Sequence, residues 1–125
     1  MDIKNLDHLV LTVENTDKTC EFYDRVLGMK KIRFGDDRRA IEFGDQKINL
    51  HQRGREVSPA AKNPTPGSAD LCFITAMSMA EVISRLEECK VEILEGPVAG
   101  TGATGPLESI YFRDPDGNLL EVSVS

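Results

Sequence analysis

Apolar and polar residues alternate along several short segments of the chain, while two other segments repeat apolar residues at helical spacing. Period-two alternation is typical of strands with one buried face, and spacings of three and four indicate helices. Residues 6–13 form the first alternating segment, with Leu9, Leu11 and Val13 on one face. A helix is predicted between Asn15, an N-cap residue, and Gly28, a C-terminal stop. Three further strands are predicted at residues 30–34, 39–43 and 47–52.

The same order of elements returns after residues 53–68, a loop rich in Pro and Ala. Residues 70–75 resemble the first strand, and Ser78 and Glu81 form a capping box that begins a second helix. Three more strands are predicted at residues 91–94, 108–113 and 118–124. This predicts an α+β fold of two βαβββ modules that form a curved mixed sheet. We expect a single domain over residues 1–125, with module one at 1–52, a linker at 53–68 and module two at 69–125.

Strand parity leaves a polar face opposite the apolar one in both predicted modules. Four residues on these faces carry metal-ligand chemistry, and we expect His8 to match Asp70 and His51 to match Glu121 between the modules. Imidazoles and carboxylates bind divalent ions such as Zn, Ni, Co, Mn or Fe(II). Glu121 could also act as a catalytic base. Each candidate also has an interpretation without a metal: the histidines could be hydrogen-bonded structural residues, Glu121 could face solvent, and Asp70 could cap a loop. Four other polar residues near these faces are expected to serve packing or solvation: Lys47, Asn49, Tyr111 and Arg113.

Composition and charge limit the classes of binding partner and the cellular location that we expect. The chain has 15 Lys and Arg residues against 21 Asp and Glu, a formal net charge of −6, which argues against nucleic acid and anionic membranes. No apolar run approaches a membrane span, and the first residues do not resemble a secretory signal, so a cytoplasmic location is expected. The three cysteines form no C-x-x-C pair and are expected to be reduced and buried.

Three segments resemble the vicinal oxygen chelate superfamily, which includes glyoxalase I, extradiol dioxygenases and the bleomycin and fosfomycin resistance proteins. The resemblance rests on residues 6–13, on 22–29 with the sequence FYDRVLGM, and on 112–122 with the sequence FRDPDGNLLEV. Within the superfamily, FGDQK, NLHQ, PGS and SIYFRD look closest to glyoxalase domain-containing protein 5 and the virulence-type glyoxalase-like proteins. The resemblance implies a curved sheet around a divalent metal ion, a small-molecule substrate and a homodimer. The family's metal positions would fall on His8, His51, Asp70 and Glu121.

The resemblance leaves three functions open. The first is a metal-dependent lyase or isomerase of the glyoxalase I type that acts on a small oxygen-chelating substrate. The second is an extradiol-like dioxygenase; these enzymes carry their second histidine at the Asp70 place, so this chain departs from their pattern. The third is a non-catalytic binding or resistance protein, and such members lack the metal residues.

Residues 100–105 spell G-x-G-x-x-G, a pattern that binds dinucleotides only between a strand and a helix. Pro106 and a predicted strand follow instead. We therefore expect an ordinary loop or a flexible lid here and no nucleotide site.

Overall fold

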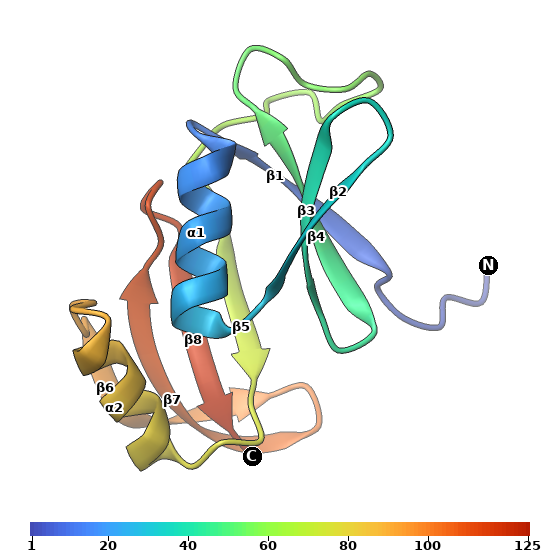
Figure 1. Cartoon of the computed structure of the whole chain (residues 1–125). Helices are drawn as coiled ribbons and strands as arrows, with labels where there is room; N and C mark the ends of the chain where they lie inside the picture. Colours follow the sequence, from blue (N-terminus) through green and yellow to red (C-terminus); the bar gives the residue numbers. More distant parts are fainter. The chain divides into compact units, whose positions relative to one another are not determined.

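A computed structural model describes all 125 residues, which divide into two compact units, Met1–Pro66 and Gly67–Ser125. Each unit contains one helix and one four-stranded mixed sheet, so the predicted α+β class and the βαβββ order of both modules are confirmed (Figure 1). No helix is long and apolar enough to cross a membrane.

Unit 1 consists of β1 (His8–Val13), α1 (Thr16–Leu27), β2 (Lys30–Phe34), β3 (Arg38–Phe43) and β4 (Gln46–Gln52). Its strand order is β1-β4-β3-β2, with β1 parallel to β4 and the other pairs antiparallel. The parallel pair is possible because α1 provides the crossover that parallel neighbours require.

The caps of α1 are those expected from the sequence. The Asn15 side chain accepts a hydrogen bond from the Lys18 backbone N–H, and Gly28 adopts a left-handed conformation with φ of 68°. Glycine tolerates this conformation because it has no Cβ. The helix therefore begins and ends on local signals.

One face of the unit 1 sheet packs against α1 and forms the core. Leu11, Val13, Ile41, Ile48 and Leu50 are buried on this face, together with Cys20, Tyr23 and Val26 of the helix. The strand pairings place His8, Asn49 and His51 on the opposite face, which no helix of unit 1 covers.

Unit 2 consists of β5 (Asp70–Ile74), α2 (Met79–Glu88), β6 (Glu95–Gly102), β7 (Gly105–Arg113) and β8 (Leu119–Val124). The strand order is β5-β8-β7-β6, the same arrangement as in unit 1. Ser78 caps α2 by accepting a hydrogen bond from the Glu81 backbone N–H. Buried Ile110, Phe112, Leu120 and Val122 lie on the face of the sheet that α2 contacts.

The sixth strand differs from the prediction, because residues 91–94 form no strand and β6 runs from Glu95 to Gly102. Its glycines give no apolar alternation, so the sequence pattern could not reveal it. Glycine is required at one position of this strand: Gly96 has a φ of 112°, and a Cβ there would lie 2.5 Å from the Ser109 carbonyl oxygen. Residues 100–105 form the end of β6, the turn and the start of β7, so a β-hairpin lies where an ordinary loop or a flexible lid was expected.

The three cysteines are free thiols, but their burial differs from the expectation. Cys20 is buried against the unit 1 core, Cys89 is half-buried at the end of α2, and Cys72 is exposed on β5. The expectation of three buried thiols is correct only for Cys20, because Cys72 lies on the face of β5 that α2 does not cover.

Candidate functional site

His8 begins β1 on the uncovered face of the unit 1 sheet. Its ring nitrogen Nδ1 lies 2.8 Å from Oδ2 of Asp7, and the side chain is 43% exposed. When Nδ1 donates to this carboxylate, Nε2 keeps its lone pair and is free to accept a metal ion or a proton. A carboxylate behind an imidazole is the usual arrangement that orients a metal-binding histidine.

Asn49 of β4 lies on the same face as His8, two strand positions from Lys47, the residue that pairs with His8. Val10 of β1 and Ala40 of β3 flank it. The Asn49 side chain is only 5% exposed, and its Oδ1 atom has no hydrogen-bond partner. A buried amide oxygen without a partner destabilises the fold, so a ligand or an ordered water that binds this oxygen would be stabilising.

His51 lies two positions further along β4, next to Thr12 of β1. It is 7% exposed, and its Nε2 atom is buried without a hydrogen-bond partner. Burial lowers the pKa of the His51 imidazole and the Arg38 guanidinium lowers it further, whereas Glu56 acts in the opposite direction. The ring is therefore held in its neutral form.

The strand register separates the two histidines. His8 pairs with Lys47 and Thr12 pairs with His51, so the two imidazoles lie four positions apart along parallel strands, about 13 Å at the usual rise. Two nitrogens on one ion lie within about 4 Å of each other. The structure therefore does not bring His8 and His51 of one chain together as ligands of the same ion.

In unit 2, Asp70 and Glu121 lie on the same sheet face, opposite the one that α2 contacts. Asp70 pairs with Leu119, so Glu121 lies two positions further along β8. His8 and Asn49 have this same offset in unit 1. Glu121 therefore corresponds to Asn49, and the predicted match with His51 is wrong. The match of His8 with Asp70 agrees with the register, because both begin the first strand of their unit.

Hydroxyl groups and a thiol surround the Glu121 carboxylate. The Ser123 hydroxyl donates to Glu121 Oε2 at 3.2 Å and lies 2.7 Å from the Ser109 hydroxyl, while the Cys72 sulfur lies 3.3 Å from Ser123. Burial raises the pKa of the Cys72 thiol, so this cysteine stays protonated. The hydrogen bond from Ser123 orients the Glu121 carboxylate through its Oε2 atom.

Tyr111 of β7 pairs directly with Glu121. Desolvation raises the pKa of the Tyr111 hydroxyl, and the Glu121 carboxylate raises it further. The phenol is thus a proton donor beside the carboxylate. From the sequence, both Tyr111 and Asn49 are expected to serve packing or solvation. The alternating pattern of β4 and β7 places both residues on the polar face, but only the pairing between strands shows which residues lie beside them.

Gly100 of β6 borders the same carboxylate from the far side of β7. A Cβ at this position would lie 3.1 Å from the Ser109 hydroxyl and 3.6 Å from Glu121 Oε2. The absence of a side chain at position 100 therefore leaves room beside the carboxylate.

Each unit offers donor atoms of the kind that bind divalent ions: an imidazole nitrogen at His8 and an amide oxygen at Asn49 in unit 1, and carboxylate oxygens at Asp70 and Glu121 in unit 2. The unpartnered Asn49 oxygen is the observation that fits such an ion. The structure contains no group of three or more His, Cys, Asp or Glu side chains placed to hold a metal ion.

Duplicated βαβββ units with a polar sheet face define the glyoxalase-like fold class. The family model of the Glyoxalase/Bleomycin resistance protein/Dioxygenase superfamily matches residues 5–122, and the chain belongs to this family. The predicted family is confirmed.

Two curated relatives match almost the whole chain. The virulence protein STM3117 of Salmonella typhimurium is 54% identical over 123 residues, covering 98% of this chain and 85% of the relative. The glyoxalase domain-containing protein RDO1 of Mycosarcoma maydis is 53% identical over 98% of this chain and 69% of its own length. A metallothiol transferase FosB of Shouchella clausii is 28% identical, covering 96% of this chain and 80% of the relative.

A solved structure of the Salmonella virulence protein superposes with a TM-score of 0.98 at 53% identity, covering 99% of this chain and 98% of that one. The integron cassette protein VCH_CASS1 of Vibrio cholerae gives a TM-score of 0.97 at 56% identity, covering 99% of this chain and 97% of the other.

Proposed function

We propose that this chain is a divalent-metal-dependent enzyme of the glyoxalase type, a lyase or isomerase for a small substrate that binds through two oxygens. The observation that carries the proposal is the buried, unpartnered oxygen of Asn49, which shares a sheet face with His8 and matches Glu121 in the duplicated fold. Family membership and the metallothiol transferase relative support a metal-dependent chemistry.

We propose His8 and Asn49 of unit 1 and Asp70 and Glu121 of unit 2 as the metal ligands. Of the four ligands predicted from sequence, this set keeps three and replaces His51 by Asn49. Three oxygens and one nitrogen favour a hard or borderline ion, with Mn(II) or Fe(II) ahead of Zn, Co and Ni. When bound, the ion would hold substrate oxygens and stabilise the negative charge that develops on them.

Glu121 is the proposed proton carrier. Its carboxylate accepts a hydrogen bond from Ser123 and lies beside the protonated Tyr111 hydroxyl. Glu121 could accept a proton from a carbon next to a substrate carbonyl and return it to the neighbouring atom, as an isomerase requires. Tyr111 would hold the carboxylate in place through this exchange.

Titration of the metal-free protein with Mn(II), followed by calorimetry and electron paramagnetic resonance, tests the proposal. We expect one ion per active site in the wild type and a loss of affinity of about 10- to 100-fold in His8→Ala and Glu121→Gln. His51→Ala is the matched control, and it should bind Mn(II) as the wild type does. Equal binding by all three variants would refute the ligand set, and loss of binding in His51→Ala as well as in the other two would restore the assignment made from sequence.

Two outcomes would redirect the function. Oxygen uptake with a catechol by the Fe(II)-loaded protein would favour a dioxygenase. Absence of any saturable metal binding would favour the non-catalytic binding protein.

A further inference from the structure

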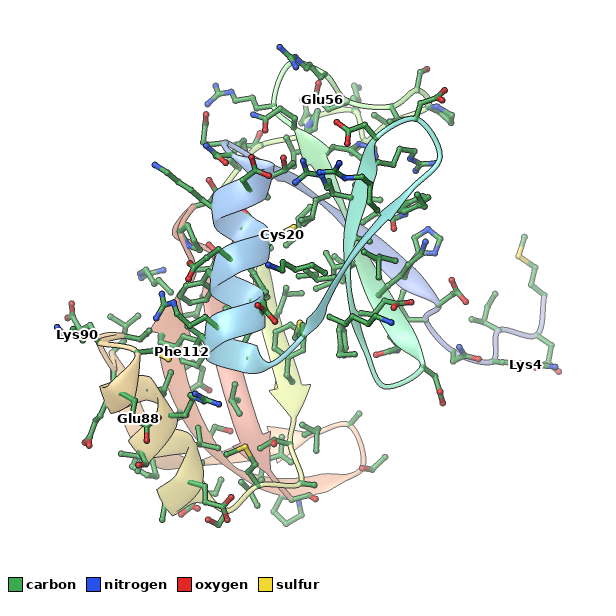
Figure 2. All side chains as sticks on the ribbon, viewed as in Figure 1. Lys4, Cys20, Glu56, Glu88, Lys90 and Phe112 are labelled. Carbon is green, nitrogen blue, oxygen red and sulfur yellow. The ribbon has the colours of Figure 1, made fainter.

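Unit 1 contains a cavity of about 620 Å³ at one end of its sheet. The hairpin between β2 and β3, the end of β4, the loop that follows it and the start of α1 line the cavity. In Figure 2 the label Glu56 marks this loop. Four arginines and one histidine line it: Arg38, Arg39, His51, Arg53 and Arg55.

Two of these arginines have carboxylate partners and two do not. Arg39 donates to Asp17, and Arg53 donates to Glu14. Arg38 and Arg55 have no carboxylate within ion-pair distance. Arg38 is instead held against the Phe34 ring, with its guanidinium carbon 4.8 Å from the ring centroid, which leaves its N–H groups free to bind an anion.

The carboxylates near the cavity do not neutralise this pair. Asp37 lines the cavity but forms an ion pair with Arg33 at 3.2 Å. Glu56 accepts a hydrogen bond from the Gly54 backbone N–H at 3.1 Å, and its charge acts on His51 and Arg53 rather than on Arg38 or Arg55. Asp36 also lines the cavity and is exposed to solvent. The cavity lining therefore keeps an excess of positive charge.

His51 provides an independent sign of a missing ligand. Its side chain lines the cavity, is 7% exposed and has a buried Nε2 without a partner. The next residue of β3 beyond the Arg39–Leu50 pair is Arg38, which places Arg38 across from His51 on the same face. A neutral imidazole carrying its proton on Nε2 donates one hydrogen bond to an anionic oxygen.

The charge of the chain is divided unequally between the units. Residues 1–66 carry 12 of the 15 Lys and Arg residues and 11 of the 21 Asp and Glu residues, a formal charge of 12 − 11 = +1. Residues 67–125 carry 3 and 10, which gives 3 − 10 = −7. Unit 1 is thus the half suited to bind an anion.

We propose that Arg38, Arg55 and His51 form an oxyanion-binding subsite that takes the carboxylate or phosphate group of a small molecule. All residues of this subsite belong to unit 1. Its assignment to the substrate rests on the proposed function: His51 lies two residues beyond Asn49 on the same strand face, about 7 Å away. The substrate would then carry its acidic group about that distance from the oxygens that bind the metal.

Titration of the metal-free, ¹⁵N-labelled protein with inorganic phosphate, and separately with acetate, tests the subsite at constant ionic strength. We expect saturable shifts in the amide and arginine signals of residues 38, 51 and 53–57 at millimolar concentrations. Arg38→Gln should weaken binding about tenfold or more, since it removes a charge-assisted hydrogen-bond donor. Arg25→Gln, on the exposed face of α1, is the matched control and should bind as the wild type does.

The outcomes separate the subsite from the metal site. Phosphate binding that survives in His8→Ala, with Mn(II) binding that survives in Arg38→Gln, supports two distinct sites. The stronger of the two anions identifies the chemical class. Absence of saturable shifts, or shifts equally weakened by Arg25→Gln, would overturn the subsite whatever the result for the metal, and the amide spectra themselves show whether each variant is folded.

Discussion

Asn49→Val should make the metal-free protein more stable and at the same time weaken metal binding. The wild-type side chain buries an amide oxygen without a partner between two apolar neighbours, Val10 and Ala40. An unsatisfied buried acceptor costs about 1–3 kcal/mol, and valine suits a strand between apolar residues. We expect a gain of about 1–2 kcal/mol in the free energy of unfolding, which raises Tm by roughly 3–8 °C in a chain of this size.

Asn118→Val is the matched control, because Asn118 is a buried asparagine whose amide is satisfied. Its Oδ1 accepts from the Ala69 backbone N–H at 2.9 Å, and its Nδ2 donates to Asp114 at 2.7 Å. Removing the amide takes the acceptor from the Ala69 N–H and one of several donors from Asp114, so this variant should lose about 1–3 kcal/mol. Both variants make the same change of side chain, at an amide without a partner inside β4 and at an amide with two partners just before β8.

Urea unfolding of the metal-free variants measures the stability change, and calorimetry with Mn(II) measures the binding change. Mn(II) affinity of Asn49→Val should fall about 10- to 100-fold. Destabilisation of Asn49→Val comparable to that of Asn118→Val would show that the Asn49 amide has a structural partner, and the reasoning would fail. A stabilised variant that binds Mn(II) like the wild type would refute the ligand role alone.

Metal binding, the Tyr111 hydroxyl and the ion pair between Asp17 and Arg39 each give one further prediction. Mn(II) at about 100 times its Kd should stabilise the wild type by about 2.7 kcal/mol in urea unfolding, and EDTA should reverse the gain; an unchanged midpoint would argue against a bound ion. Tyr111→Phe should lower kcat and leave Mn(II) affinity unchanged, since Tyr111 pairs with Glu121 and is not one of the proposed ligands; equal losses in both would show a structural role. The hydrogen bond from Arg39 lowers the pKa of Asp17 below 3.8, so the wild type should be more stable than Asp17→Asn at pH 7, and the difference should shrink as pH falls below 3.8; a difference that does not change with pH would contradict this.

Local signals predicted most of the fold. The caps at Asn15, Gly28 and Ser78 act through hydrogen bonds or backbone conformations within a few residues, so a single stretch of sequence contains the information. Alternation likewise predicted the faces of the strands. The β6 strand was missed because its glycines pair through the backbone and carry no apolar pattern.

Only part of the candidate site could be predicted from the sequence. The register between two strands depends on how they pair, and the residues of one strand alone do not determine it. Parity alone correctly placed His51 on the same face as His8, but it could not show how far along the sheet His51 lies. The pairing of His8 with Lys47 makes Asn49 the counterpart of Glu121. An asparagine among apolar residues has no distinctive pattern, and only its unpartnered oxygen singles it out.

The lack of a side chain at Gly100 determines which substitutions β6 would tolerate in an engineered variant. A methyl group there would lie 3.1 Å from the Ser109 hydroxyl, closer than an ordinary contact, whereas the side chains of Ala99 and Thr101 are exposed to solvent. A library that randomises this strand and selects for turnover should therefore recover glycine at position 100 and accept many residues at its two neighbours. The accepted sequences would then vary mainly at every second position of β6, because side chains of the neighbouring strand β7 occupy the space beside the positions in between.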